Sequence, residues 1–449
     1  MMTLILVAIL LIGYGLIATG NVTNVNKAAV AMFMGTVGWV LYICYGSDFV
    51  MSQHPSEYSD WLAGASPTSS TVKYYIAQNI FLKYVGRAAE VVLFLLSTMT
   101  IVEILNNNGC FDFISPFVRT RKSRKFLWMI TGITFIISAN LDNLSTTTMM
   151  LVIMHSMVPS RRLRMLYGCA IVLAANCGGA LTVIGDPAGL VLWNMGAVTA
   201  TRFSMALFLP CVLSWALPTY WIGRQLPERI DMDLPAMPYR GDDTNLNVWQ
   251  RLLMLFVGIG GLWFIPTFHN ITKLSPFLGA LCVLSVLWIV NEIFNHRLMN
   301  VDQMIQRRMP RVLQYGVLQL MLFVMGIMLA LGVVKETGAL TWFAQLCQQY
   351  IGNVWIMGLL SGIISAILDN FASAMTFFSL DFNTPTNGLY WKVIAYSTAV
   401  GGNLLCVGSM SGLALIKLER IKVGWYFRNI GLLTAVSWMI GLAILWMVD

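Results

Sequence analysis

The sequence predicts an all-α polytopic membrane protein made of two inverted repeats. Each repeat is expected to have five transmembrane helices and one re-entrant helical hairpin, with a broken helix after the hairpin. The 449 residues are 57% hydrophobic and 11% charged, with a mean hydropathy of +0.72, whereas soluble domains have about 25% charged residues. A short polar phrase also occurs twice, followed both times by a glycine-interrupted apolar run. This composition gives no reason to expect a nucleic-acid partner.

Apolar runs of about 20 residues, long enough to cross a bilayer, occur about ten times. The net charge of +8 is concentrated in the loops between them, and basic residues in short loops mark the cytoplasmic side. The resulting alternation places both termini outside and indicates the inner (cytoplasmic) membrane of a cell. The runs are near 2–18, 28–47, 87–108, 165–200, 203–223, 252–268, 275–295, 312–334, 390–415 and 430–448.

Two further apolar runs, 126–158 and 354–380, predict re-entrant hairpins. The first is flanked by basic residues on both sides, at 119–125 and 161–164, so both of its ends should be cytoplasmic. A single helix of that length would be about 50 Å long, well beyond a hydrocarbon core of about 30 Å. The second run has no basic flanks, so we expect it to enter from outside.

The repeated phrase defines the two halves. SANLDN at 138–143 and SAILDN at 365–370 are 227 residues apart. Each is followed by an interrupted run, NCGGALTVIGDPAG at 176–189 and VGGNLLCVGSMSG at 400–412. Matched broken helices in two halves are typical of secondary transporters with a site at the membrane midplane. The predicted organisation is a first repeat, 1–223, with hairpin 126–158 and broken helix 165–200, a cytoplasmic linker, 224–251, and a second repeat, 252–449, with hairpin 354–380 and broken helix 390–415.

Acidic side chains at membrane depth are the first candidates for function, because a buried charge there costs a few kcal/mol or more. Asp142 and Asp369 fall at the predicted hairpin tips, and Asp186 falls where Gly185 and Pro187 interrupt a helix. The alternative is that these residues only cap helix ends, as Asp and Asn often do. Position 409, which matches Asp186, is a serine, so a main cation site should lie nearer the first half.

Carboxylate, amide and backbone carbonyl oxygens are the ligands that hard cations prefer. We therefore expect sodium or lithium to bind Asp142, Asn143 and Asp186, and we expect no cofactor. The candidate ion-binding residues are Asp142, Asn143, Asn176, Asp186, Ser365, Asp369, Asn370, Asn403 and Ser409, with Thr146, Thr147 and Glu103 as possible supporting residues.

Three segments, MTIVEILNNNG at 99–109, the run at 120–150 that contains SANLDN, and NCGGALTVIGD at 176–186, resemble NhaD-type sodium/proton antiporters of the ion transporter superfamily, which have a citrate transporter-like domain. The resemblance implies a homodimer with an outer scaffold and a mobile unit that moves like an elevator. It implicates the residues matching Asp142, Asn143, Asn176, Asp186, Ser365, Asn370 and Ser409 in ion binding. The chain has Pro187, Ala188 and Gly189 where members usually have a valine and two threonines.

The expected function is secondary active transport, in which sodium or lithium is exchanged for protons, and not an enzymatic reaction. A carboxylate can hold either a proton or a dehydrated cation, so one site can exchange the two. The alternative is a sodium-coupled carrier of citrate, a dicarboxylate or another anion of the same superfamily, although acidic tips would repel a carboxylate. An intramembrane aspartyl protease would also use paired aspartates, but it gives no reason for two opposed hairpins.

Overall fold

The computed structural model describes residues 1–23, 25–64, 66–231, 246–295, 315–380, 382 and 384–448. Within these residues, eight helices are long and apolar enough to cross a membrane, and two shorter apolar helices are Met2–Ala18 and Val354–Ile367. The prediction of an all-α polytopic membrane protein is therefore confirmed. Half of the linker 224–251 (residues 232–245), the basic loop 296–311 and Asp449 fall outside the described residues.

The helices include three that continue directly from π-helical turns at Ile76–Phe81, Phe256–Gly260 and Phe427–Gly431. In chain order they are α1 Met2–Ala18, α2 Gly20–Thr23, α3 Lys27–Cys44, α4 Gly46–Gln53, α5 Pro55–Leu62, α6 Ser69–Tyr75, α7 Leu82–Asn107, α8 Ile114–Val118, α9 Ser123–Asn140, α10 Asn143–Met157, α11 Arg161–Leu181, α12 Pro187–Asn194, α13 Ala200–Gln225, α14 Val248–Leu255, α15 Gly261–Thr272, α16 Pro276–Asn295, α18 Tyr315–Glu336, α19 Ala339–Tyr350, α20 Val354–Ile367, α21 Asn370–Phe378, α22 Leu389–Gly401, α23 Met410–Glu419, α24 Val423–Tyr426 and α25 Leu432–Val448.

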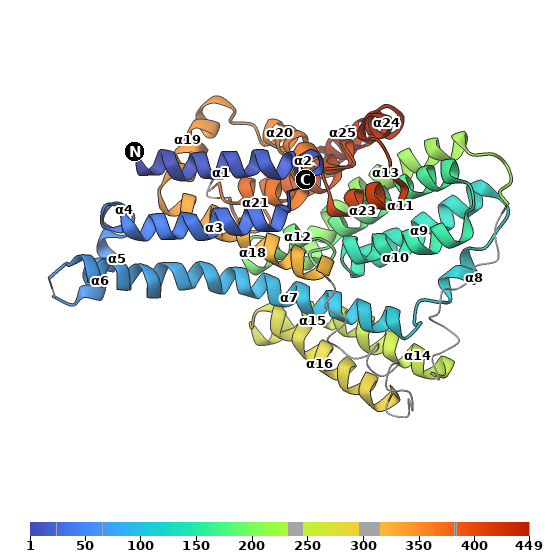
Figure 1. The fold of residues 1–449 in the computed structure, drawn as a ribbon, viewed down its shortest axis with the longest axis horizontal. Helices are drawn as coiled ribbons and strands as arrows, with labels where there is room; N and C mark the ends of the chain where they lie inside the picture. The colour runs from blue at the N-terminus through green and yellow to red at the C-terminus, as the bar shows by residue number, and fades with distance from the viewer. Residues whose placement is uncertain are drawn as a thin grey trace.

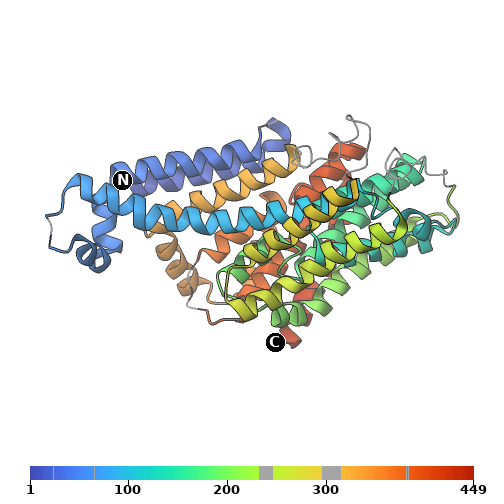
Figure 2. The ribbon, with the colours of Figure 1, turned by 90° about the horizontal axis from the view of Figure 1, so that it is seen from below.

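One group of helices, the α3–α18 group, consists of α1, α3, α7, α15, α16 and α18, which pack on one another (Figure 1). Its centre is the contact between α3 and α18, where a Cβ on Gly326 would lie 2.4 Å from the backbone of Ala31. Trp39 adds a hydrogen bond from Nε1 to the carbonyl oxygen of Leu329, at 3.1 Å. Both views show α1, α3 and α18 side by side (Figure 2). Close backbone approach therefore fixes this group.

The second group, the hairpin group, consists of α9–α13 and α20–α25, in which α11 packs on α9, α13 and α22, and α20 packs on α22. It contains both copies of the repeated phrase. Contacts of α21 with α18 and of α12 with α7 join it to the α3–α18 group. The candidate residues on the repeated phrases and the interrupted helices thus lie in one packing group, next to a second.

Candidate functional site

Four helix breaks meet at the candidate site. The chain leaves helical geometry between α9 and α10, between α11 and α12, between α20 and α21, and between the short 3-10 turn Gly402–Leu404 and α23. Hydrogen bonds connect the breaks, including Asn370 N to the Gly408 carbonyl at 2.9 Å and Ser411 Oγ to the Asn143 carbonyl at 3.2 Å. Residues more than 200 positions apart therefore form one polar centre.

Each helix that starts at this centre is capped by a candidate residue. Asp142 accepts from Ser145 N at 2.7 Å, and Asp186 accepts from Ala188 N at 2.8 Å. In the second half, Asp369 accepts from Phe371 N at 3.1 Å and Ser409 from Gly412 N at 3.1 Å. Capping satisfies free backbone amides, and the positive helix end stabilises a carboxylate. Capping accounts for only one oxygen of each acid, so the other oxygen distinguishes them.

The second oxygens of the three buried acids have different surroundings. Asp142, Asp186 and Asp369 are 3%, 3% and 1% exposed. Within the described residues, Asp142 Oδ2 has no hydrogen-bond partner. Asp186 Oδ2 accepts from two asparagine amides, Asn143 Nδ2 at 3.2 Å and Asn370 Nδ2 at 3.1 Å, while Asp369 Oδ2 lies 3.6 Å from Lys27 Nζ. Asp369 Oδ2 also has no hydrogen-bond partner among the described residues, but it is paired with the Lys27 ammonium, so Asp142 is the acid of the three whose second oxygen has neither a hydrogen bond nor an ion pair there.

A layer of neutral polar side chains lies beside these acids. Asn176 Nδ2 donates to Asn403 Oδ1 at 2.6 Å and to Ser409 Oγ at 2.9 Å. Asn143 Nδ2 also lies 3.4 Å from Asn176 Oδ1. Asparagines of both halves are therefore bonded to each other, and they hold the two interrupted helices together beneath Asp186.

The threonines after Asp142 differ in their hydrogen bonds. Thr146 and Thr147 are fully buried, and their hydroxyl oxygens have no hydrogen-bond partner among the described residues. Thr148, in contrast, is exposed and donates to the Ser145 carbonyl at 2.9 Å. Thr146 and Thr147 lie at the start of α10, which Asp142 caps. The start of this helix thus has a carboxylate oxygen and two hydroxyl oxygens without partners among the described residues.

The two serines of the repeated phrase make the same contact. Ser138 Oγ donates to the Ala175 carbonyl, and Ser365 Oγ donates to the Thr398 carbonyl, both at 2.6 Å. The backbone at Gly185 can approach the Ser138 carbonyl because glycine has no side chain; a Cβ on Gly185 would lie 2.6 Å from that carbonyl oxygen. The hydroxyl of Ser365, a candidate ligand, therefore ties α20 to α22.

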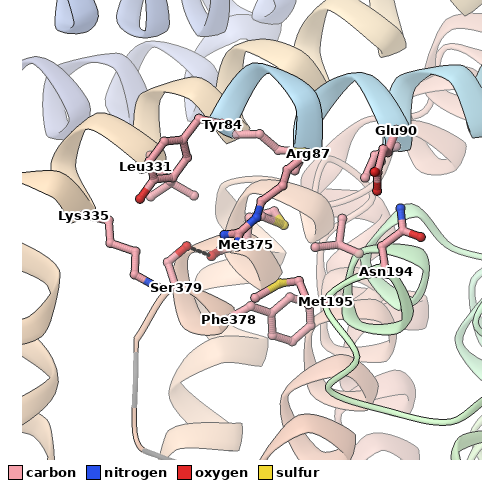
Figure 3. A pocket seen from close by; sticks show the side chains of 14 residues that line it. Tyr84, Arg87, Glu90, Asn194, Met195, Leu331, Lys335, Met375, Phe378 and Ser379 are labelled. Carbon is pink, nitrogen blue, oxygen red and sulfur yellow. Dashed lines mark hydrogen bonds between the residues drawn. The ribbon is translucent and has the colours of Figure 1, made fainter. Parts of the chain in front are cut away.

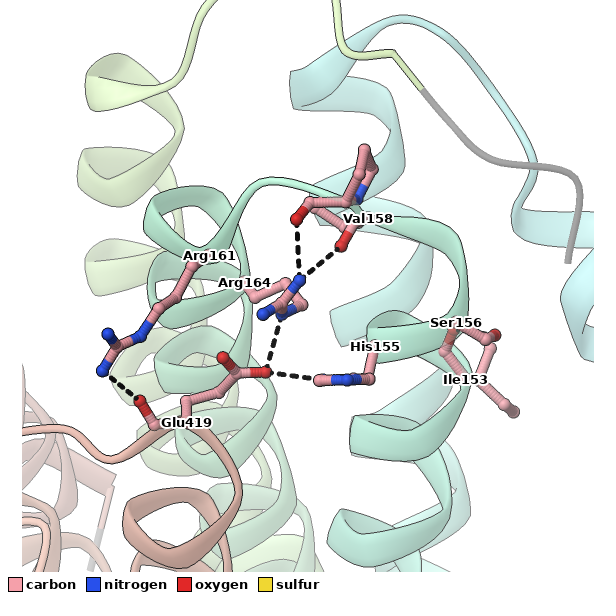
Figure 4. Close-up of polar contacts among 8 residues, drawn as sticks. Ile153, His155, Ser156, Val158, Arg161, Arg164 and Glu419 are labelled. Carbon is pink, nitrogen blue, oxygen red and sulfur yellow. Dashed lines mark hydrogen bonds and ion pairs between the residues drawn. The ribbon is translucent and has the colours of Figure 1, made fainter.

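Two charged residues that the sequence analysis did not single out make ion pairs, and the supporting candidate Glu103 lies on another helix. The side chain of Lys27 is 10% exposed, and its Nζ lies 3.6 Å from Asp369 Oδ2. Glu419, at the end of α23, accepts from Arg164 Nε at 2.9 Å and contacts His155 Nδ1 at 2.8 Å (Figure 4). Glu103 lies partly buried on α7, in the other packing group. A lone lysine at the start of an apolar helix was the available signal for Lys27.

Comparison with known proteins identifies the family. A family model described as citrate transporter (CitMHS) matches residues 1–401. The chain belongs to the citrate transporter family. It is therefore a multi-pass membrane protein and a secondary transporter of the ion transporter superfamily, and its named relatives are transporters rather than enzymes.

Relatives are similar over most of this chain. Sodium/proton antiporter 1 of Arabidopsis thaliana is 32% identical over 80% of this chain, which spans 62% of that protein. Sodium/proton antiporter 2 of the same plant is 30% identical, with 77% of this chain and 82% of the relative covered. The Na(+)/H(+) antiporter NhaD of Vibrio parahaemolyticus is 26% identical, with 74% and 83% covered.

In this citrate transporter family member, a cavity of about 230 Å³ lies between the two helix groups where they meet. Its walls are α7 and α18 on one side and α12 and α21 on the other. The side chains of Arg87, Glu90, Lys335 and Asn194 line it (Figure 3). Polar side chains therefore line a cavity at the interface between the groups. Two of the helices that form this cavity, α12 and α21, are capped by Asp186 and Asp369.

Proposed function

We propose that the protein exchanges sodium or lithium for protons, with Asp142 and Asp186 as the acids that hold either ion. The observation that carries the proposal is Asp142 Oδ2, a buried carboxylate oxygen without a hydrogen-bond partner in the described part of the chain. Uncompensated buried charge is strongly unfavourable, so this oxygen requires a proton or a cation. The hydroxyls of Thr146 and Thr147 supply neutral oxygens of the kind that bind hard cations.

Asp186 is the second acid that we propose for the exchange, and two asparagine amides hold its carboxylate in place. Its two amide donors, Asn143 and Asn370, come from the two different halves. A cation bound next to Asp186 would compensate the carboxylate charge in place of the hydrogen bonds from these two amides. A proton bound to Asp186 would neutralise the carboxylate, so that no cation is required there. Binding at Asp186 therefore reaches both hairpins, which supports a role for Asn143 and Asn370 in the same site. The names of the antiporter relatives agree with this assignment.

The proposal includes an inverted repeat with re-entrant hairpins, the domain boundaries predicted from the sequence, and an elevator-like movement in a homodimer. The matched bonds of Ser138 and Ser365 support two related halves. The separate α3–α18 group and hairpin group support movement of one against the other. The proposal also includes a location in the inner membrane, which the short loops favour, and both termini outside, which the distribution of basic loops favours.

The test is ion exchange in proteoliposomes that contain the purified protein. A sodium gradient should drive proton movement reported by a pH-sensitive dye, and lithium, potassium and citrate are compared under the same conditions. Asp142→Asn should abolish the exchange. Asp48→Asn, the same change at an exposed residue of α4, should leave it intact and serves as the matched control.

Two results would contradict the proposal. Undiminished exchange in Asp142→Asn would remove this residue from the site. Sodium-dependent uptake of labelled citrate without proton exchange would instead assign the chain to the anion carriers of its superfamily.

A further inference from the structure

A buried ion pair connects the two helix groups at the tip of the second hairpin. Lys27 Nζ lies 3.6 Å from Asp369 Oδ2, and the two side chains are 10% and 1% exposed. Lys27 is the first residue of α3, which packs on α1 and α18. Asp369 lies between α20 and α21 of the hairpin group. A lysine of one group thus compensates an acid of the other.

The matching position in the first half has no such compensation. Asp142 occupies the same place in the repeated phrase as Asp369, and its Oδ2 has no hydrogen-bond partner among the described residues. In other respects the two carboxylates are alike, because Asp142 caps α10 and Asp369 caps α21. The two hairpin tips therefore differ in whether a positive charge of the protein reaches them.

The hydroxyl side chains that follow the two aspartates also differ between the halves. Thr146 corresponds to Ser373, whose Oγ donates to the Ser361 carbonyl at 3.1 Å, and Thr147 corresponds to Ala374, which has no hydroxyl. Asp369 Oδ2, like Asp142 Oδ2, has no hydrogen-bond partner among the described residues, but Lys27 Nζ lies 3.6 Å from it. Within the described residues, the first tip therefore combines a carboxylate oxygen that no cation of the protein approaches with two hydroxyls that lack partners, and the second tip does not.

We propose that Lys27 is the built-in counter-ion of Asp369 and occupies the place that a transported cation would take there. An ammonium carries the same charge as sodium, but it is tethered to α3 and is not released with the cargo. Exchange then uses a single cation centre at Asp142 and Asp186. The number of cations rests on the proposed function, whereas the ion pair does not.

The energetics of buried ion pairs provide a test that needs no transport. Removing one partner of such a pair leaves an uncompensated charge and is strongly destabilising, whereas replacing both partners with neutral side chains of similar size is often neutral. Lys27→Met and Asp369→Asn should each lower the midpoint of thermal unfolding in detergent. The double variant should recover it. Additive losses in the double variant would overturn the proposal.

Transport then separates a counter-ion from a ligand. Asp369→Asn alone leaves the Lys27 ammonium without its partner and should cause a loss of sodium-driven proton exchange, and the double variant should recover exchange. If Asp369 is itself a ligand of the transported cation, the double variant stays as impaired as Asp369→Asn alone, and the proposal is wrong.

The sodium dependence reports the number of centres, because a Hill coefficient cannot exceed the number of coupled sites. We expect a coefficient of about 1 in the wild type, and a rise above 1 in Lys27→Met as the freed carboxylate admits a second cation. A merely structural role for Lys27 would leave the coefficient unchanged, and that result would overturn the proposal.

Two further outcomes are informative. If a single variant does not accumulate in the membrane, accumulation of the double variant is the measurement, and its absence counts against the ion pair. If the wild type exchanges no sodium for protons, the proposed function fails, while the thermal unfolding of the four proteins still decides whether Lys27 compensates Asp369.

Discussion

Thr146→Val separates ion binding from stability, because valine keeps the shape of threonine and lacks the hydroxyl. Thr146 is fully buried, and its hydroxyl oxygen has no hydrogen-bond partner in the described residues. It lies in the first turn of α10, four residues after Asp142, the N-cap whose Oδ2 has no hydrogen-bond partner among the described residues. If Thr146 served only for packing, valine would fill the same space without burying a hydroxyl that lacks a partner.

The two effects of this substitution have opposite signs. A buried polar group without a partner costs the folded state about 1–3 kcal/mol, so valine should leave the free energy of unfolding unchanged or raise it by up to that amount. A polar contact to a charged group contributes about 1.5–3 kcal/mol, which corresponds to roughly 10- to 150-fold in affinity. Sodium should therefore bind more weakly to a protein that is at least as stable.

The assay compares two measurements on the same proteoliposome preparations, the sodium concentration that gives half-maximal proton exchange and the midpoint of thermal unfolding. Thr148→Val is the matched control, because Thr148 is exposed and its hydroxyl bonds to the Ser145 carbonyl. The control should leave the sodium dependence unchanged. An unchanged sodium dependence in Thr146→Val as well would refute the assignment of this hydroxyl as a ligand.

Two other substitutions test the framework around the site. Gly185→Ala should destabilise the protein by about 1–3 kcal/mol through overpacking, because the added Cβ would lie 2.6 Å from a carbonyl oxygen of α9; Gly86→Ala, with open space around it, is the control, and equal thermal stability of the two variants would contradict the reasoning. Glu419→Gln should cost about 1–3 kcal/mol because its side chain is 1% exposed and bonded to Arg164. The exposed Glu57 provides the control in the same thermal unfolding assay, and no difference between Glu419→Gln and Glu57→Gln would show that the buried contact is not stabilising.

The sequence predicted the membrane character of the protein because hydropathy and loop charge are local properties. It also identified the residues at all four helix breaks, since Asp142, Asp186, Asp369 and Ser409 stand beside glycine, proline or the repeated phrase. Capping and ion binding could not be separated at that level, because the same side chains serve both purposes. The structure shows that all three acids cap a helix, and it adds what the second carboxylate oxygen of each one contacts.

The sequence alone determined which residue types are present at the breaks and that two acids fall in the first half and one in the second. Only the tertiary structure decided their partners, since Asn143 and Asn370 reach Asp186 from segments more than 200 residues apart along the chain. It also decided that Lys27 faces Asp369. An ion pair between different helix groups depends on their packing, and no periodicity or spacing in the chain encodes that contact.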